Sequence, residues 1–352
     1  MKIAFILPAL INKGPIIVAH SIVKYLKDKV DLIDVYYFDD NEKTLDFDCD
    51  IYHINKSVVI DFDKYDIIHS HTFRADLYVF KWRKKIMHAK IISTIHQDTF
   101  KSFSIQYNNV ASYFLTHYWC FIHRQFDGVV SISNQIKDKY NKLLLNKITT
   151  IHNGCNIDNV NINKEIEDSI QLYKEKGYKI LGSYAYITQG KGLLQVVKVL
   201  ELLPDYVFVL IGQGPYLAKI KKNVEKLNLS DRVLFIPYIQ APYSYLKFFD
   251  IYMMPSYSEG FGLAMVEAAL AQKSIVCSKL ASFYEIFNDN EVCFFELDDS
   301  ESLAQAIKLA DIESQKRGKR AFDKANMFFT SQKMADNHLL YYRQISNKYL
   351  KT

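Results

Sequence analysis

The chain has 352 residues, a formal net charge of +5 and five cysteines. This length suits two α/β domains, at roughly 150 residues per domain, and so small a charge excludes the concentrated basic surface of a nucleic-acid-binding protein. The cysteines are odd in number and widely spaced, with no C-x-x-C pair, which excludes a disulfide framework and a zinc site and favours a reducing, cytoplasmic environment.

The first half of the sequence alternates short apolar runs with helical patterns. The run from Lys2 to Ile11 begins like a signal peptide, but it is short and lacks a small-residue cleavage site, so we expect a buried strand. Val18, Ile22 and Leu26 follow at helical spacing, and further strands are expected at 30–38, 66–69, 90–95, 128–131 and 149–152. This order predicts a parallel sheet with helices on both faces. No apolar run reaches the roughly 18 residues of a membrane-spanning helix.

The second half repeats this alternation after a polar stretch, 158–176, which has little periodicity and predicts the crossing between two domains. Strands are expected at 179–187, 206–211, 233–236, 250–254 and 274–277. A final helix, from about Ser331 to Leu350, is compatible with packing on either domain. The sequence therefore predicts an α/β protein of two Rossmann-like, doubly wound parallel-sheet domains, residues 1–160 and 161–334.

Glycine-containing turns follow several of these strands, at the edge where doubly wound sheets bind ligands. The first, Gly14-Pro15, is also typical of an ordinary connection. In the second, Gly190-Lys191-Gly192, glycines flank a lysine that either approaches a diphosphate or is simply solvated. A Gly212-x-Gly214 turn has half of a dinucleotide fingerprint, with Leu217 at the third glycine position, and we expect it to cover a nucleotide.

A further glycine-containing turn, Glu259-Gly260-Phe261-Gly262, precedes a helix that begins at Leu263. Glu267 lies about two helical turns beyond Glu259. Glutamate is rarely buried without a partner, and the hydroxyl groups of a sugar or ribose are suitable partners for a carboxylate. Two Asp-Phe-Asp triplets, 46–48 and 61–63, lie in polar stretches away from the turns and are interpreted as solvated charge. With no metal site expected, Lys191 and helix-terminal N–H groups must meet the charge of a leaving group.

Histidines also stand at predicted strand ends. His69 and His71 follow one strand and His96 follows the next. A lone histidine in such a place is more often structural than catalytic, but two neighbouring strands that end in this way favour a site. We expect acceptor contacts from His71 and from Arg74 and Asp76, which come just after it.

In order and spacing these motifs match one family. The chain resembles the family-4 retaining glycosyltransferases, which have the GT-B fold of two Rossmann-like domains, over nearly its whole length. The most specific motif is the Glu-x7-Glu signature from Glu259 to Glu267. The supporting motifs are Asp66 to His71, Thr94-Ile95-His96, Asn153-Gly154 before Asp158, Lys191-Gly192, Ile211 to Pro215 and Asp231-Arg232-Val233.

The resemblance implies a role for each matching residue. Glu259 would bind the donor sugar's hydroxyls, His96 would lie beside the donor sugar and the acceptor, and Glu267 would hold the ribose. Lys191 would neutralise the diphosphate. Gly14 would let the loop after the first strand come close to that diphosphate. The backbone of the turn would donate to the sugar and phosphate, through Gly260, Phe261, Gly262 and Leu263. The family's last helix, here about 335–352, crosses back onto the first domain.

Two positions depart from the family pattern. Tyr186 stands where the family usually has an arginine on the diphosphate, and a phenol lacks the fixed charge and fork of a guanidinium. Pro237 stands where a glycine is common near the base pocket. Donor affinity and base preference are the properties that these two residues affect.

The predicted function is the transfer of a hexose or N-acetylhexosamine from a nucleoside-diphosphate sugar, with UDP as the expected nucleotide. The transfer is expected to retain the anomeric configuration and to need no metal or other cofactor. The expected acceptor is a glycan, a lipid-linked sugar or another cell-envelope molecule such as lipopolysaccharide or capsule. The leaving diphosphate would itself accept the acceptor's proton. The alternatives are a nucleotide-sugar epimerase on the same fold and a donor-binding but inactive partner subunit.

The expected location is the cytoplasm, with no nucleic-acid partner and with peripheral contact to the inner face of the plasma membrane as an open alternative. The segment Val79 to Met87, which contains Lys81 to Lys85, mixes basic and bulky apolar residues and fits either an anionic membrane surface or a solvated surface helix. A group of nearby aromatic residues fits an acceptor entrance or a helix core. They are Phe103, Tyr107, Tyr113, Phe114, Tyr118 and Trp119.

Overall fold

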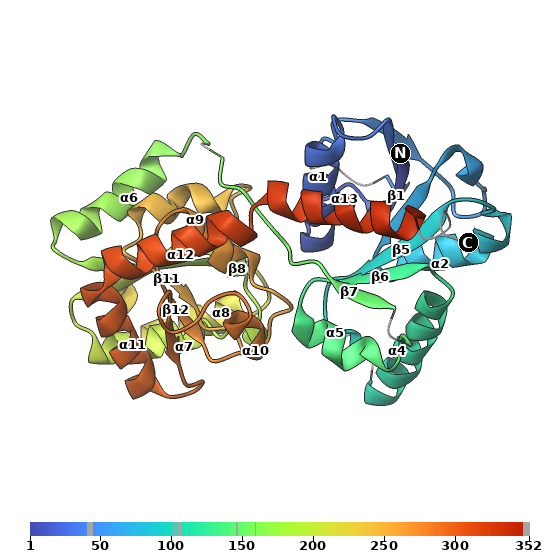
Figure 1. Ribbon diagram of the computed structural model, residues 1–352. Coiled ribbons are helices and arrows are strands. Elements are labelled where there is room, and N and C mark those ends of the chain that lie inside the picture. The colour runs from blue at the N-terminus through green and yellow to red at the C-terminus, as the bar shows by residue number, and fades with distance from the viewer. Residues whose placement is uncertain (41–44, 101–102, 104–107, 146, 159, 348–352) are drawn as a thin grey trace. The chain divides into compact units, whose positions relative to one another are not determined.

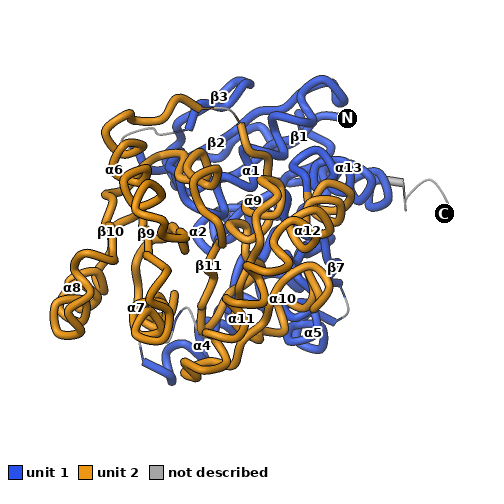
Figure 2. Tube along the Cα trace, turned by 90° about the vertical axis from the view of Figure 1, so that its left-hand side faces the viewer, with its two compact units in different colours: residues 1–154, 330–352 blue, residues 155–329 orange. Residues whose placement is uncertain are grey.

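The computed structural model describes residues 1–352 except 41–44, 101–102, 104–107, 146, 159 and 348–352. The chain forms two compact units (Figure 2). Unit 1 contains Met1–Gly154 and Thr330–Thr352, and unit 2 contains Cys155–Phe329. These ranges differ by a few residues from those expected from the sequence, because the Cys155 N–H donates to the Phe329 carbonyl at 3.0 Å and so joins both ends of unit 2.

Unit 1 is built on a seven-stranded parallel sheet in the order β3-β2-β1-β4-β5-β6-β7. The strand order reverses between β1 and β4, which pair in register from Ile3 with Ile67 to Ile6 with Ser70. The strands are β1 (Lys2–Ala9), β2 (Leu32–Asp39), β3 (Asp50–His53), β4 (Ile67–His71), β5 (Lys90–Ile95), β6 (Gly128–Ser131) and β7 (Ile148–Thr150). The central strands β1 and β4 are buried over nearly their whole length because helices cover both of their faces.

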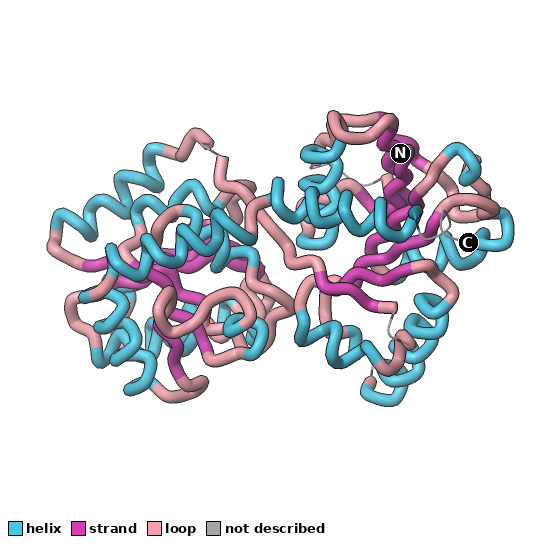
Figure 3. Tube along the Cα trace, viewed as in Figure 1, coloured by secondary structure: helices cyan, strands magenta, loops and turns pink. Residues whose placement is uncertain are grey.

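The helices of unit 1 surround this sheet (Figures 1 and 3). They are α1 (Gly14–Leu26), η1 (Phe62–Lys64), α2 (Phe73–Trp82), η2 (Arg83–Lys85), α4 (Asn109–Arg124), α5 (Asn134–Asn141) and α13 (Ser331–Asn347). Pro15 lies in the first turn of α1, where its missing N–H costs no hydrogen bond. The C-terminal helix α13 packs against α1, so the end of the chain completes the unit that the start of the chain began.

Unit 2 is built on a six-stranded parallel sheet in the order β10-β9-β8-β11-β12-β13. Its strands are β8 (Lys179–Tyr186), β9 (Tyr206–Gln213), β10 (Val233–Ile236), β11 (Ile251–Met254), β12 (Ser274–Ser278) and β13 (Cys293–Phe295). Its helices are α6 (Lys164–Glu175), η3 (Gln189–Lys191), α7 (Leu194–Val199), η4 (Leu200–Leu202), α8 (Leu217–Lys226), η5 (Ser230–Arg232), η6 (Pro242–Phe248), α9 (Leu263–Leu270), α10 (Ala281–Tyr284), α11 (Ser300–Ile312) and α12 (Ser314–Phe328).

The two doubly wound parallel sheets confirm the predicted fold class. One segment differs. The polar stretch expected as a crossing contains α6, which Asn163 caps by accepting from the Glu165 and Ile166 N–H groups. Ile170 of α6 is buried, and Ile166 and Tyr173, at helical spacing from it, are half-buried. The sequence therefore held a short apolar stripe that its many charged neighbours obscured. Within the described residues, no helix has the length and apolar character needed to cross a bilayer.

Candidate active site

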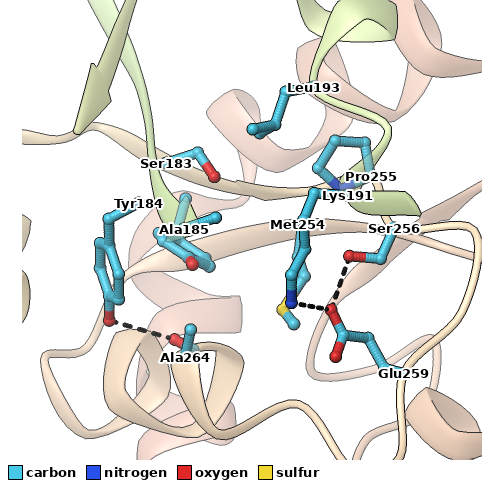
Figure 4. Close-up of a pocket in the computed structure, with 11 residues that line it drawn as sticks. Ser183, Tyr184, Ala185, Lys191, Leu193, Met254, Pro255, Ser256, Glu259 and Ala264 are labelled. Atoms are coloured by element: carbon cyan, nitrogen blue, oxygen red, sulfur yellow. Dashed lines mark hydrogen bonds and ion pairs between the residues drawn. The ribbon is translucent and has the colours of Figure 1, made fainter. Parts of the chain in front are cut away.

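Unit 2 contains a cavity of about 180 Å³ at the carboxyl ends of β8 and β11. These two strands are neighbours at the point where the strand order reverses, which is the usual ligand position in a doubly wound sheet. Figure 4 shows the residues that line the cavity. They are Ser183, Tyr184, Ala185, Lys191, Leu193, Tyr252, Met254, Pro255, Ser256, Glu259 and Ala264.

Lys191 and Glu259 form an ion pair inside this cavity (Figure 4). Lys191 Nζ donates to Glu259 Oε1 at 2.6 Å, and Ser256 Oγ donates to the same oxygen at 2.8 Å. The Ser256 carbonyl in turn accepts from Ser278 Oγ on β12. The cation and the carboxylate that the sequence assigned to opposite parts of a donor are therefore held together, with the carboxylate fixed by a second donor.

The loop that carries Glu259 is tied to the turn that carries Lys191. The Tyr257 N–H donates to the Gly190 carbonyl at 2.8 Å, and Gln195 Nε2 donates to the Pro255 carbonyl at 3.0 Å. Gly192 has φ +64°, and a Cβ there would lie 1.9 Å from the Pro255 carbonyl oxygen. Only glycine fits this position, so the close approach of the two loops explains why Lys191 is followed by Gly192.

Glu267 lies on α9, one side of the same site, and accepts a hydrogen bond of 2.5 Å from the Tyr184 hydroxyl. Burial raises the pKa of Glu267 to about 7, while the Tyr184 hydrogen bond acts to lower it. Tyr184 is buried on β8, with its ring 5.2 Å from that of Tyr252. Sequence reasoning missed Tyr184, and the available signal was a polar group inside an otherwise apolar central strand.

The turn before α9 offers its backbone rather than its side chains. Gly262 is the N-cap of α9, so the N–H groups of Leu263 and Ala264 precede the first hydrogen bond of the helix, which runs from Met265 to the Gly262 carbonyl at 3.0 Å. Phe261 is buried, with its ring in an edge contact with Phe329 at 5.7 Å. Gly260 precedes it in the same loop. The role of these residues as donors to the sugar and phosphate stays a prediction.

The turn that follows β9 packs on the end of β8. A Cβ on Gly212 would lie 2.1 Å from the Ala185 carbonyl oxygen, and one on Gly214 would lie 2.3 Å from that of Ile187. This contact explains both glycines without a ligand, and their predicted place beside the nucleotide stays a prediction. Tyr186, at the end of β8, exposes 65% of its surface.

Unit 1 brings the predicted histidines together. His71 Nδ1 and His96 Nε2 are 2.9 Å apart, and His69 is hydrogen-bonded to Thr94 Oγ1 at 2.8 Å and to Tyr342 OH at 2.6 Å. The ring of His338, on α13, lies 5.7 Å from that of His69. Sequence reasoning missed His338 because its neighbours come from the other end of the chain.

These imidazoles are neutral at physiological pH. Burial and the nearby His69 ring hold the pKa of His71 well below its usual value, and burial with the charge of His338 lowers the pKa of His96 to about 3. His96 is therefore a hydrogen-bonding group rather than a cation. In the part of the chain that the structure describes, no three His, Cys, Asp or Glu side chains have the arrangement of a metal site.

The structure corrects the role expected of Asp76. Its carboxylate is fully buried and accepts from Ser70 Oγ at 2.5 Å and from Trp119 Nε1 at 2.6 Å, with His123 Nε2 at 2.9 Å. It holds β4, α2 and α4 together and is not an acceptor contact. The Arg74 guanidinium is exposed and donates twice to the Asp39 carboxylate. The space beside Gly14 is open, since a Cβ there would have no neighbour within 4 Å.

The aromatic group near α4 divides between core and surface. Trp119 is buried, while Tyr113, Phe114 and Tyr118 are exposed. Phe103 is partly buried, with its ring 5.9 Å from that of Trp119. Tyr107 lies outside the described residues.

Comparisons with known proteins identify the family and the fold to which the chain is similar. Residues 25–159 match the family described as Glycosyltransferase Family 4, and residues 164–325 match Glycosyl transferases group 1. The O-antigen biosynthesis glycosyltransferase WclY of Escherichia coli is 28% identical over 99% of this chain and 100% of its own length.

A Campylobacter jejuni N-acetylgalactosamine-N,N'-diacetylbacillosaminyl-diphospho-undecaprenol 4-alpha-N-acetylgalactosaminyltransferase is 26% identical over 51% of each chain. Among solved structures, Anabaena Alr3699/HepE in complex with UDP and glucose superposes with a TM-score of 0.80, at 17% identity, over 97% of this chain and 99% of that one. The matches to both halves, together with the shared fold, identify this chain as a glycosyltransferase of group 1, family 4, with the GT-B fold.

Proposed function

We propose that the enzyme transfers a hexose or N-acetylhexosamine from a UDP-sugar, with retention and without a metal ion, to a glycan or lipid-linked acceptor of the cell envelope, such as lipopolysaccharide or capsule. The observation that carries the proposal is the cavity of unit 2, which Lys191 and Glu259 line and whose lining residue Tyr184 donates to Glu267 on α9. A cation, two carboxylates and a helix N-terminus are the groups that a diphosphate joined to two polyols requires.

In this proposal Lys191 binds the diphosphate and gives up part of its ion pair with Glu259 when the donor arrives. Glu259, still held by Ser256, accepts from the sugar hydroxyls, and Glu267 accepts from the ribose. Backbone N–H groups at the start of α9 supply the remaining positive potential to the leaving phosphate. Because Glu259 is a hydroxyl ligand, no protein nucleophile is assigned, and the departing diphosphate takes the acceptor's proton on the same face.

Acceptor recognition is assigned to unit 1, through the half-buried, neutral His96 and the exposed Arg74, while the fully buried His71 positions His96. The relatives motivate the acceptor class, since one is named for O-antigen biosynthesis and another for a diphospho-undecaprenol substrate. UDP is favoured as the nucleotide because the similar Anabaena structure holds UDP and glucose. We propose that the reaction takes place at the cytoplasmic face of a membrane, as such acceptors would require.

A thermal-shift screen with chelator present tests donor binding. UDP and UDP-sugars are expected to raise the unfolding temperature, since a ligand that binds only the folded state stabilises it, and more so the tighter it binds at a given concentration. Lys191→Met is expected to abolish this shift, whereas Lys198→Met, at an exposed lysine of α7, keeps it. The anomeric configuration of the product, followed by nuclear magnetic resonance, then tests the mechanism. Shifts that require a divalent ion, or an inverted product, would contradict the proposal.

Tyr186 favours a second candidate, a subunit that binds the donor without turning it over, because Lys191 is left without the expected arginine. That subunit would show the UDP-sugar shift but release no UDP with any glycan or lipid-linked acceptor. An epimerase would instead convert the donor sugar with no acceptor present.

A further inference from the structure

Helix α4 of unit 1 presents an aromatic face to solvent. Its inner face is buried through Ser112, Thr116, Trp119 and His123. On the opposite side of the same helix turns, large apolar side chains are exposed, with Phe114 at 67% and Phe121 at 46% of their surface. The outer face consists of Val110, Tyr113, Phe114, Tyr118 and Phe121, and we refer to these residues as the α4 face.

The α4 face lacks the charges that keep an ordinary surface helix in water. From Asn109 to His123 the helix contains no Asp, Glu, Lys or Arg. A solvent-facing helix normally carries its charged residues on this side. Aromatic residues gathered on one exposed face instead mark a surface that is covered in the working protein.

A cluster of positive charges adjoins the α4 face. The Phe121 ring contacts the Phe80 ring of α2, with centroids 6.0 Å apart, and the Arg83 guanidinium lies 4.1 Å from the Phe80 centroid. Lys81, Lys84 and Lys85 follow on the same segment and are exposed. Across the described residues, none of these four cations forms an ion pair with a carboxylate.

We propose that the α4 face and the cations of Lys81 to Lys85 form one docking surface for an anionic lipid bilayer, with the aromatic rings entering the interface and the cations meeting lipid phosphates. Tyrosine and phenylalanine suit this place because their rings are apolar and the tyrosine hydroxyl reaches the headgroups. Juxtaposed lysine and arginine supply attraction to anionic lipid. The inference does not depend on the donor or the acceptor proposed above.

The charges favour a bilayer over a second copy of the chain. Two copies that met through the α4 face would cover the rings but would bring no carboxylate of α4 to the cations beside it, since the helix contains no Asp or Glu. An anionic surface would satisfy the rings and the cations at once. Helices α2 and α4 pack against each other in unit 1, so the rings and the cations lie on neighbouring elements.

Flotation of the full chain with vesicles tests the proposal. We expect binding to vesicles of phosphatidylcholine with phosphatidylglycerol, and much weaker binding to phosphatidylcholine alone. The double variant Phe114→Ser, Tyr118→Ser is expected to weaken binding by roughly tenfold or more, since each buried ring contributes to insertion. Replacing Lys81, Lys84 and Lys85 with Gln is expected to remove the preference for anionic lipid.

Matched variants elsewhere separate this surface from general stickiness. Ile312→Ser with Met327→Ser removes two exposed apolar side chains of unit 2, and Lys198, Lys222 and Lys226 changed to Gln remove three exposed lysines. Both sets should bind as the parent does. A Phe114→Trp variant should show blue-shifted emission only with anionic vesicles.

Three results would overturn the proposal. They are no vesicle binding by the parent chain at low salt, equal losses in the control variants, and a dimer in sedimentation that the Phe114→Ser, Tyr118→Ser variant dissociates while vesicle binding is unchanged. Circular dichroism of each variant shows whether its fold is kept, which these exposed positions are expected to allow.

Discussion

Glu267 has a hydrogen-bond donor that favours its ionised form and a buried position that disfavours it. It is held by the Tyr184 hydroxyl at 2.5 Å, and its pKa is raised to about 7 by burial. In a protonated carboxyl group one oxygen carries a proton and acts as a donor, whereas in the ionised form both oxygens accept hydrogen bonds. The charge state of Glu267 therefore decides how well it can accept from the ribose hydroxyls assigned to it.

Donor affinity is accordingly expected to rise with pH. If only ionised Glu267 binds the ribose, the Kd for UDP-glucose falls about tenfold between pH 6 and 8, as linkage to a pKa of about 7 requires. Tyr184→Phe removes the hydrogen bond that lowers this pKa, so the midpoint moves to higher pH. Calorimetric titration with UDP-glucose measures both, because this ligand lacks the terminal phosphate that itself titrates near pH ~6.

Tyr252→Phe is the control for this change, since Tyr252 lines the same cavity and contacts the Tyr184 ring without a hydrogen bond to Glu267 among the described contacts. Its pH midpoint should match the parent. A Kd that is flat from pH 6 to 8, or an equal shift in both variants, would exclude Glu267 as the titrating ligand.

At the scale of single residues, the sequence pointed to candidate site residues where they stand inside a recognisable motif. Lys191 and Glu259 follow strands in glycine turns, and the structure brings them to 2.6 Å from each other. Ser256 was missed as a partner although Glu259 is only three residues further on, because a serine so close to a turn is common without such a role. Tyr184 was missed as a partner because it gains its role from Glu267, which is distant along the chain. Asp76 was assigned wrongly for the same reason, since its partner Trp119 comes from α4.

At the scale of elements, the turn η3 is the part of the site with least freedom. Gly190 lies in it and Gly192 is its C-cap, and the two glycines differ in what surrounds them. The nearest atom to a Cβ on Gly190 would be the Thr188 hydroxyl at 3.8 Å, whereas a Cβ on Gly192 would strike the Pro255 carbonyl oxygen. The Gly192 backbone also has a positive φ, which an L side chain rarely adopts.

Gly192→Ala is therefore expected to lower the free energy of unfolding by on the order of 3 kcal/mol, from backbone strain and from displacement of the Pro255 loop. This variant should also bind UDP more weakly, because the substitution separates the turn that carries Lys191 from the loop that carries Glu259. Gly190→Ala is expected to change stability by less than about 1 kcal/mol. Urea unfolding and UDP titration of the two variants measure this difference, and similar values for both would show that the loops can separate freely.

The elements themselves were largely predictable where both faces of a strand are buried. β1, β5 and β9 are apolar runs bounded by turns, and each lies where expected. Helix α6, with one buried residue, and β3, whose side chains are all exposed, leave no such pattern. The α4 face was ambiguous for a different reason. Aromatic spacing shows that a helix has an apolar side but does not show what covers it.

At the scale of the whole molecule, the two units differ in which protons they bind on folding. Unit 1 buries His69, His71 and His338 in neutral form, and burial lowers the pKa of His338 to about 4. Unit 2 buries Glu267 with a raised pKa. Below pH 6.5 the unfolded histidines take up protons that the folded ones do not, so unit 1 loses stability as the pH falls. Glu267 acts in the opposite direction, because its folded form binds a proton more readily than its unfolded form between pH 4.5 and 7.

Acidification is therefore expected to destabilise unit 1 selectively. Between pH 7 and pH 5, His338 alone costs about 2 kcal/mol, since its pKa is 6.5 when unfolded and about 4 when folded. Scanning calorimetry should show a transition that moves down by roughly 4 to 8 °C at pH 5 and is insensitive to UDP-glucose. His338→Gln should reduce this movement, and His88→Gln, at an exposed histidine, should not. A UDP-sensitive transition that falls further than the other one would contradict the assignment of acid sensitivity to the histidines of unit 1.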